Sequence, residues 1–268
     1  MRPFAFVAFA LVLSASRPSS AAAQREEQAN LVLTIFAGTV TGHHLWTVAK
    51  QPLTVLNTTN YDTLALSRSI GSSIVLGVTG TYFFSPHVGL NAELSYLGLP
   101  VDSDCRGLFY HPDADNKNEQ MCDNIAAQSP EGGAIAIFGG VTLRAASRRA
   151  FSPYLQGSLG IVNYAHSSIA MDGFYVTTAG PQPPRQILAD PNPRRTSLML
   201  GMGVGFASSL GTGYQFRLEV RDVVTSLDRL VGPANSLGIG PKASRSYHHF
   251  ALTLGLGVVL ERQRGRRY

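Results

Sequence analysis

The sequence is 268 residues long, with 44% hydrophobic residues, 15% charged residues and 27 glycines. About 25% of the residues of a soluble domain are usually charged, so this chain is poor in charge for a protein in water. The formal net charge of +5 reflects a small excess of arginine. No basic run is interleaved with aromatic residues, which excludes a nucleic-acid groove and nucleic acid as a partner.

The N-terminus has the features of a secretory signal peptide. A short basic start, 1–3, precedes an apolar run, 4–13, and Ala21 to Ala23 supply an Ala-x-Ala cleavage site. The apolar run is too short to span about 30 Å of hydrocarbon, and no later segment offers about 20 consecutive apolar residues. We therefore predict a signal peptide over 1–23 and a single mature domain over 24–268.

Eight stretches of the mature chain alternate apolar residues with small or polar ones, as strands with one apolar face do. The predicted strands are 31–41, 73–84, 88–97, 133–144, 153–164, 197–207, 214–223 and 248–260. The first has the weakest pattern, because apolar residues fall on both faces: Leu31, Leu33 and Ile35 on one, Val32, Phe36 and Val40 on the other. Nearly every other stretch has one fully apolar face and one small or polar face. This is the inside-out pattern of a transmembrane β-barrel, in which small or polar residues fill a narrow lumen.

The connections between these strands alternate in length. Short turns join the second and third, fourth and fifth, and sixth and seventh strands. Long polar segments, which we expect to be mobile loops, cover 42–72, 98–132, 165–196 and 224–247. With a periplasmic N-terminus, every short turn is periplasmic and all four long loops are extracellular, as in outer-membrane barrels. The sequence therefore predicts an all-β, eight-stranded antiparallel up-and-down transmembrane β-barrel.

Aromatic residues gather near the predicted strand ends, where interfacial girdles are expected. Those near the short turns are Tyr82, Phe84, Phe151, Tyr154, Phe206, Tyr214 and Phe216, and those near the long loops are Tyr96 and Tyr164.

The arrangement resembles the small eight-stranded outer-membrane barrels of the OmpA, OmpX and opacity-protein type, over essentially the whole mature chain. Segment 216–222 is most like that family. The resemblance implies an outer-membrane location, contact with membrane lipid and lipopolysaccharide, and folding by the barrel-assembly machinery. Such barrels usually end on an aromatic residue of the last strand. Here Arg262, Arg264 and Arg266 precede Tyr268 on the lipid-facing parity, so we expect 261–268 to form a periplasmic tail.

Four charged residues fall on the predicted lumen face: Glu93, Arg217, Glu219 and Arg221. Eight strands enclose a space about wide enough for side chains alone, so charges there need partners. We predict an ion-pair network that plugs the lumen, and a gated polar path is the alternative.

Cys105 and Cys122 are the only cysteines, and both lie in the loop over 98–132. Export through an oxidising periplasm predicts a disulfide between them, worth about 3 kcal/mol in the chain-entropy model. Between them, Asp113, Asp115 and Glu119 only partly match a calcium loop, because Lys117 and Asn118 occupy the third ligand and turn-glycine positions. We expect no metal and no cofactor.

Two other functions remain as alternatives to a structural or surface-interaction role. A lipid-A-modifying barrel enzyme is suggested by the His-x-Ser spacing of His166 and Ser168, but no partner acid is found in the same loop. A secreted, lipocalin-like barrel that binds a small ligand would bury its apolar face, which is the opposite parity. We therefore expect no enzyme.

Overall fold

The computed structural model describes residues 30–41, 44–56, 58–112, 115–128, 132–145, 151–166, 169–190, 195–210, 213–226 and 246–261. The predicted signal peptide, residues 227–245 of the last long connection and residues 262–268 of the predicted tail lie outside these segments. Within the described residues, no helix is long and apolar enough to cross a membrane.

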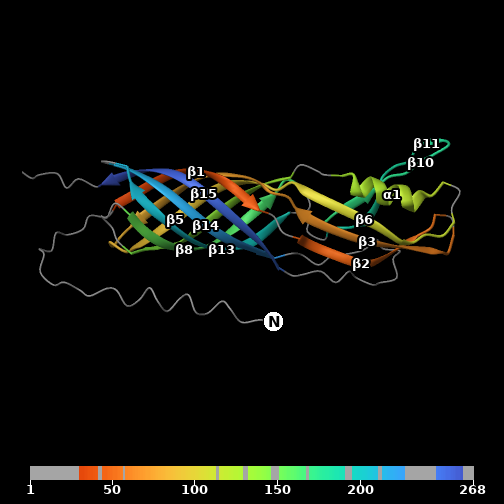
Figure 1. The fold of residues 1–268 in the computed structure, drawn as a ribbon, viewed down its shortest axis with the longest axis horizontal. Helices are drawn as coiled ribbons and strands as arrows, with labels where there is room; N and C mark the ends of the chain where they lie inside the picture. Colours follow the sequence, from red (N-terminus) through yellow and green to blue (C-terminus); the bar gives the residue numbers. More distant parts are fainter. Residues whose placement is uncertain are drawn as a thin grey trace, which may run out of the picture.

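Eight antiparallel strands close into a barrel in the order β1-β15-β14-β13-β8-β7-β5-β4, which lies at the left of Figure 1. They are β1 (Asn30–Thr41), β4 (Ser73–Phe83), β5 (Val88–Gly98), β7 (Gly133–Arg144), β8 (Phe151–Tyr164), β13 (Thr196–Ser209), β14 (Tyr214–Ser226) and β15 (Ser246–Glu261). Each corresponds to one predicted strand, and their ends differ by at most three residues. The predicted fold class is confirmed.

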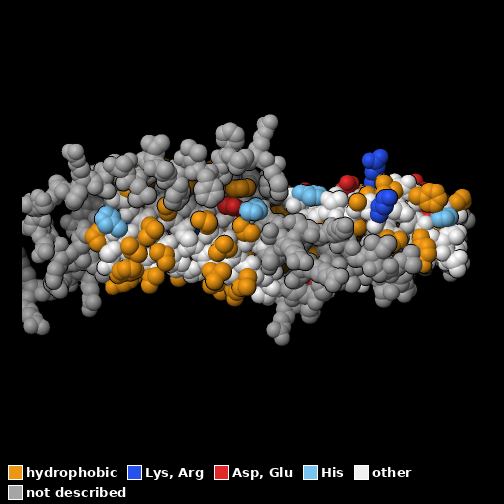
Figure 2. Space-filling view, turned by 90° about the horizontal axis from the view of Figure 1, so that it is seen from below, with side chains coloured by type: hydrophobic (Ala, Val, Ile, Leu, Met, Phe, Trp, Pro, Cys, Tyr) orange, Lys and Arg blue, Asp and Glu red, His pale blue; other side chains and the backbone are white. Residues whose placement is uncertain are grey.

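Alternation along each strand separates an exposed apolar outer face from a buried inner face. In β15, Leu254 is 51% exposed and the neighbouring Thr253 is 7% exposed. Strand β1 follows the same rule, since Ile35 is 72% exposed and Phe36 is 8% exposed. Both faces of β1 are apolar because its inner residues fill the lumen. The exposed apolar side chains of the barrel strands, called the apolar belt below, are visible on the barrel in Figure 2.

Glycines make room for three aromatic rings inside the barrel. Phe36 lies opposite Gly77 of β4 and Gly255 of β15 in the strand register. A Cβ atom added to Gly77 would lie 2.4 Å from the Phe36 ring, and one added to Gly205 would lie 2.6 Å from the Tyr154 hydroxyl. Phe138 stands over Gly160 in the same way. A side chain at these glycines would clash with the rings, so the small residues are needed for the fit.

Three of the four long connections fold into a compact extension, shown at the right of Figure 1. Its sheet has the order β2-β3-β6 and consists of β2 (His44–Thr54), β3 (Tyr61–Ile70) and β6 (Val101–Phe109). Helix α1 (Lys117–Ala126) packs on β6, and β9 (Met171–Gly173) pairs with β12 (Arg185–Leu188). A short hairpin joins β10 (Val176–Thr177) to β11 (Gly180–Pro181). The end of the barrel that carries the extension is called the extension end, and the opposite one the turn end.

The prediction of mobile loops is therefore wrong for these three connections. Their apolar residues recur with the spacing of a strand or of a helix, and they pack together in one common core. Leu64 and Leu66 of β3, Met121 and Ile125 of α1, and Ile187 of β12 are each at most 1% exposed. The described part of the fourth connection consists of strand ends, and residues 227–245 lie outside the described residues.

Candidate functional site

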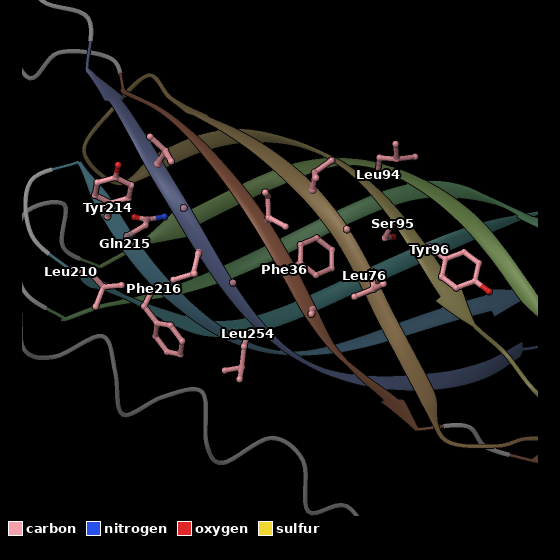
Figure 3. A pocket seen from close by; sticks show the side chains of 18 of the residues that line it. Phe36, Leu76, Leu94, Ser95, Tyr96, Leu210, Tyr214, Gln215, Phe216 and Leu254 are labelled. Carbon is pink, nitrogen blue, oxygen red and sulfur yellow. The ribbon is translucent and has the colours of Figure 1, made fainter.

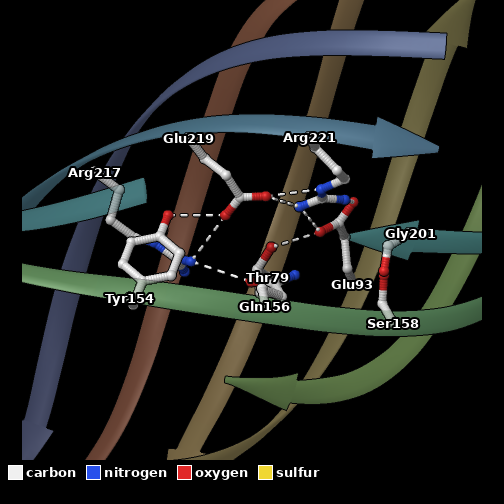
Figure 4. A network of polar contacts seen from close by, with 9 residues as sticks. All are labelled: Thr79, Glu93, Tyr154, Gln156, Ser158, Gly201, Arg217, Glu219 and Arg221. Atoms are coloured by element: carbon white, nitrogen blue, oxygen red, sulfur yellow. Dashed lines mark hydrogen bonds and ion pairs between the residues drawn. The ribbon is translucent and has the colours of Figure 1, made fainter. Parts of the chain in front are cut away.

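The four predicted lumen charges meet inside the barrel, as Figure 4 shows. Glu93 comes from β5, and the other three residues alternate along the inner face of β14. Arg221 donates from Nη1 and Nη2 to the two carboxylate oxygens of Glu93 at 2.6 and 2.8 Å, and from Nε to Glu219 Oε1 at 2.7 Å. Arg217 Nη2 lies 3.3 Å from Glu219 Oε2. Arg221 thus bridges the two carboxylates, and Glu219 bridges the two guanidinium groups.

Tyr154 of β8 also belongs to this network. Its hydroxyl donates to Glu219 Oε2 at 2.8 Å and accepts from Arg217 Nε at 3.2 Å. The Arg217 guanidinium also lies 4.6 Å from the centre of the Tyr154 ring. The prediction that Tyr154 belongs to an interfacial girdle is wrong, because the residue is only 5% exposed and faces the lumen. The sequence could have indicated the lumen position, since Tyr154 lies two residues before Gln156 and therefore on the same, inner face of the strand.

The network is balanced in charge and removed from solvent. Its two carboxylates and two guanidinium groups belong to residues that are at most 9% exposed. A buried charge that loses its partner costs several kcal/mol, so each member depends on the others. The cavity beside the network measures only about 10 Å³, which is about the size of one water molecule. Side chains therefore fill the lumen at this level.

The lumen between the network and the extension end is lined mainly by apolar residues, and Ser95, Thr225 and His249 are buried polar residues among them. Buried residues here include Val40, Val75, Leu97, Val162 and Met199. They form one continuous cluster with the core of the extension, including Trp46, Leu64 and Ile187. The expectation of a small or polar filling therefore holds for the network level, whereas the filling of the extension end is mainly apolar. The apolar filling follows from the extension, which seals this end from water.

The turn end of the lumen is polar and then closes on an aromatic residue. Thr81, Asn91 and Thr142 are buried on its inner face. Phe83 is 7% exposed, and the Arg144 guanidinium lies 3.7 Å from the centre of its ring. Arg144 Nε also donates to the Pro86 carbonyl at 2.6 Å, which holds the side chain across this end.

Buried polar groups tie the parts of the extension together. Arg68 of β3 donates to Ser103 of β6 at 3.3 Å and to the Ala170 carbonyl at 2.9 Å. Burial lowers the pKa of Arg68 to about 10, and the nearby Asp172 carboxylate opposes this shift. A disulfide between Cys105 and Cys122 joins β6 to α1. These links come from three connections that are distant in sequence.

Asp62 of β3 is a second buried polar residue that joins parts of the extension, and it is 3% exposed. Its carboxylate accepts from the His111 backbone at 2.8 Å and from Asn118 Nδ2 at 2.7 Å, and it lies 3.2 Å from His111 Nδ1. Burial and the carboxylates of Glu119, Asp123 and Asp62 raise the pKa of Tyr110 to about 12. Among the described residues, no group of three or more His, Cys, Asp or Glu side chains is placed to hold a metal ion. Asp113 of the partial calcium motif lies outside them.

The outer surface of the barrel offers a broad apolar pocket, drawn in Figure 3. Its lining includes Leu76, Leu94, Leu254 and Phe216, which stand on the outward faces of four strands. Near the turn end, Phe206 packs against Phe151 with ring centres 4.8 Å apart and against Phe216 at 6.5 Å. The pocket is therefore part of the apolar belt.

No protein-family model and no curated protein matches this chain. Among solved structures, the outer membrane protein OprG from Pseudomonas aeruginosa is similar, with a TM-score of 0.50 and 14% identity over 88% of this chain and 97% of its own. The outer membrane protease OmpT from Escherichia coli has a TM-score of 0.42 and 11% identity over 86% of this chain and 97% of its own. The outer membrane protein AlkL has a TM-score of 0.41 and 15% identity, over 94% and 99%.

At these identities the likeness concerns the fold alone. The closed barrel, its strand order and its outward apolar faces agree with the similarity to OprG. The chain has the fold of the small eight-stranded outer-membrane β-barrels.

Proposed function

We propose that the protein is an outer-membrane barrel, closed to diffusion, that holds a folded extension outside the cell in a structural or surface-interaction role. The observation that carries this proposal is the continuous filling of the barrel. The charged network gives way to an apolar cluster that runs without a break into the core of the extension. The barrel and the extension then act as an anchor and a presented module.

The apolar belt supports the membrane location. Soluble monomers rarely expose contiguous apolar patches larger than a few hundred Å². Here apolar side chains that are roughly half exposed follow one another along all eight strands. In the same proposal, residues 1–23 direct export, and residues 262–268, which follow the end of β15 at Glu261, form the periplasmic tail predicted over 261–268. The barrel-assembly machinery and outer-membrane lipid, including lipopolysaccharide, are the partners.

The two alternatives lack support of their own. A soluble, lipocalin-like barrel would expose the belt to water and needs room for a ligand, whereas the lumen is filled at the network. For a lipid-A-modifying enzyme, His166 is exposed at the extension end of β8, and Ser167 and Ser168 lie outside the described residues. We therefore retain the non-enzymatic role as the proposal.

Lysine labelling tests location and orientation together. The three lysines, Lys50, Lys117 and Lys242, all lie in the long connections, and Lys50 is exposed on β2. A membrane-impermeant amine reagent applied to intact cells is expected to label Lys50, and the signal at that peptide is lost in Lys50→Arg. The amine of the mature N-terminus is expected to react only after the outer membrane is permeabilised.

Labelling of Lys50 only after permeabilisation would reverse the proposed orientation. Recovery of the protein in the soluble periplasmic fraction, without heat-dependent gel mobility, would overturn the membrane location itself.

A further inference from the structure

A charged pair interrupts the apolar belt near the extension end. Asp222 of β14 and His248 of β15 have the outward parity of Val220 and Phe250. In the register, Asp222 lies between Met202, which is 69% exposed, and Phe250, which is 45% exposed. Among barrel residues whose side chains the structure describes, Asp222 is the one carboxylate on the outward face. Ionisable groups on a membrane-facing surface are costly and usually mark a function.

The carboxylate of Asp222 orients the His248 ring. His248 Nδ1 lies 2.9 Å from Asp222 Oδ2 and 3.2 Å from Oδ1. With Nδ1–H donated to the carboxylate, the other ring nitrogen, Nε2, is directed away from Asp222. The His248 side chain is 48% exposed, and that of Asp222 is 33% exposed. A histidine held in this way presents one nitrogen to a ligand.

Polar side chains continue this interruption onto the next strand. Thr41 of β1 pairs with Phe250 and donates from Oγ1 to its carbonyl at 3.1 Å. Thr39 pairs with Leu252 and is exposed on the same outward face. Near the extension end, polar side chains on β14, β15 and β1 therefore replace the apolar side chains of the belt. At this edge an outer-membrane barrel meets the headgroups of the outer leaflet.

We propose that Asp222 and His248 form a binding site for the phosphate headgroup of an outer-leaflet lipid, a proposal that rests on the proposed function. His248 Nε2–H donates to a phosphate oxygen, and Asp222 is the positioning residue that accepts from Nδ1–H. The imidazolium is then held between two anions, the carboxylate and the phosphate. A lipid is favoured over free phosphate because the acyl chains of the same molecule can lie along the adjacent belt, over Leu252 and Val220.

The site is tested with purified protein in maltoside micelles, whose headgroup carries no phosphate. Short-chain phosphatidic acid is titrated by calorimetry into the wild type and into His248→Ala, His248→Lys, Asp222→Asn and His87→Ala. We expect His248→Ala to weaken binding about tenfold or more, because a charge-assisted hydrogen bond is lost. His248→Lys should restore binding to within a few-fold of the wild type. Asp222→Asn should weaken it less than His248→Ala does.

His87→Ala is the matched control. His87 is also exposed at an end of the barrel, but it lies at the turn end, and its Nδ1 contacts a backbone carbonyl, that of Arg144. Its removal should leave the affinity unchanged. Equal affinity of the wild type and His248→Ala, or an equal loss in His87→Ala, would overturn the site.

Two further outcomes separate the parts of the proposal. Tighter binding by Asp222→Asn would overturn the positioning role, and displacement of the lipid by an equal concentration of inorganic phosphate would overturn the lipid as ligand. Heat-dependent gel mobility is measured on every variant. A correctly folded barrel that binds no phosphatidic acid contradicts this inference alone, whereas a chain found outside the membrane contradicts the proposed function.

Discussion

The charged network and the extension close the same barrel by opposite means. At the network, four buried charges are joined through Arg221 and Glu219, and the stability of the barrel depends on each charge keeping its partner. At the extension end, closure comes from apolar side chains such as Leu64 and Met199, which need only exclude water. The first arrangement tolerates the loss of a whole pair better than the loss of one partner. The second weakens in proportion to the volume removed.

Two spectroscopic signals allow the regions to be followed separately. Trp46 is the only tryptophan and is 1% exposed in the extension, so its fluorescence reports on that region. The far-ultraviolet circular dichroism of the protein is dominated by the long strands of the barrel.

The largest effect is expected from removing one charge of the network. Arg221→Ala leaves Glu93 and Glu219 buried without their main partner and should lower the free energy of unfolding of the barrel by about 3–5 kcal/mol. Urea unfolding in lipid vesicles, followed by circular dichroism, measures it.

The matched double variant, Glu93→Gln with Arg221→Met, removes the pair together and leaves Glu219 with Arg217. It should cost clearly less than Arg221→Ala. The single variants Glu93→Gln and Arg221→Met are measured as well. If the double variant loses as much stability as these two lose in sum, the pair is not coupled.

The extension should respond to a cavity without affecting the barrel. Leu64 is 0% exposed, and Leu64→Ala should destabilise the extension by about 2–5 kcal/mol through lost burial and a cavity. The Trp46 transition should move to lower urea, and the circular-dichroism transition should stay. Leu108→Ala on β6, where the side chain is 47% exposed, is the control and should change stability by less than about 0.5 kcal/mol. Coincident shifts of both transitions would mean that the regions unfold as one.

Loss of the disulfide should also be confined to the extension. The bond closes a loop with a sequence separation of 17, and the Cys105→Ser, Cys122→Ser double variant should lose about 3 kcal/mol. Reduction of the wild type should move the Trp46 transition by a similar amount. An unchanged Trp46 transition in the double variant would refute a stabilising role for this bond.

A smaller effect is expected from the Tyr154 hydroxyl. Tyr154→Phe keeps the ring under Arg217 but removes the hydrogen bonds to Glu219 and Arg217, which should cost about 1–3 kcal/mol in barrel stability. Tyr96→Phe, on the outer face and 46% exposed, should cost almost nothing. Equal losses in the two variants would place the Tyr154 hydroxyl outside the network.

The smallest effect is a dependence on alkaline pH. Since the folded chain raises the pKa of Tyr110 to about 12, from an ordinary value of 10.0, the unfolded chain loses this proton first. Extension stability should therefore fall as the pH rises from about 10 to about 12. Arg68, with a lowered pKa, contributes in the opposite direction, so the comparison is made with Tyr110→Phe, in which the fall should be weaker. An identical pH profile in that variant would contradict the role of Tyr110.

The barrel could be predicted from the sequence because its rule is local. Strand parity places Leu254 outside and Glu219 inside without reference to any distant residue, and alternating connection lengths add the antiparallel order. The same parity would have placed Tyr154 inside, but its position near a turn suggested a girdle. In β1 the pattern was ambiguous, because Phe36 fills space left by glycines on two other strands, and that fit is visible only in the register.

The extension could not be predicted in the same way. Its core joins Leu64, Ile125 and Ile187 from three separate connections. The apolar residues of each connection pack against those of the other two, and the polar residues between them indicated loops. Arg68 and Asp62 were missed for the same reason, since their partners come from other connections or from distant parts of the chain.

Conductance in planar lipid bilayers tests closure most directly. Purified wild-type protein is expected to give no steady current steps, because both the network and the apolar filling close the lumen. Glu93→Ala should also give none, because the apolar filling remains. Steady, ion-selective steps in the wild type that vanish in Glu93→Ala would contradict this account and show that the network lines an open path.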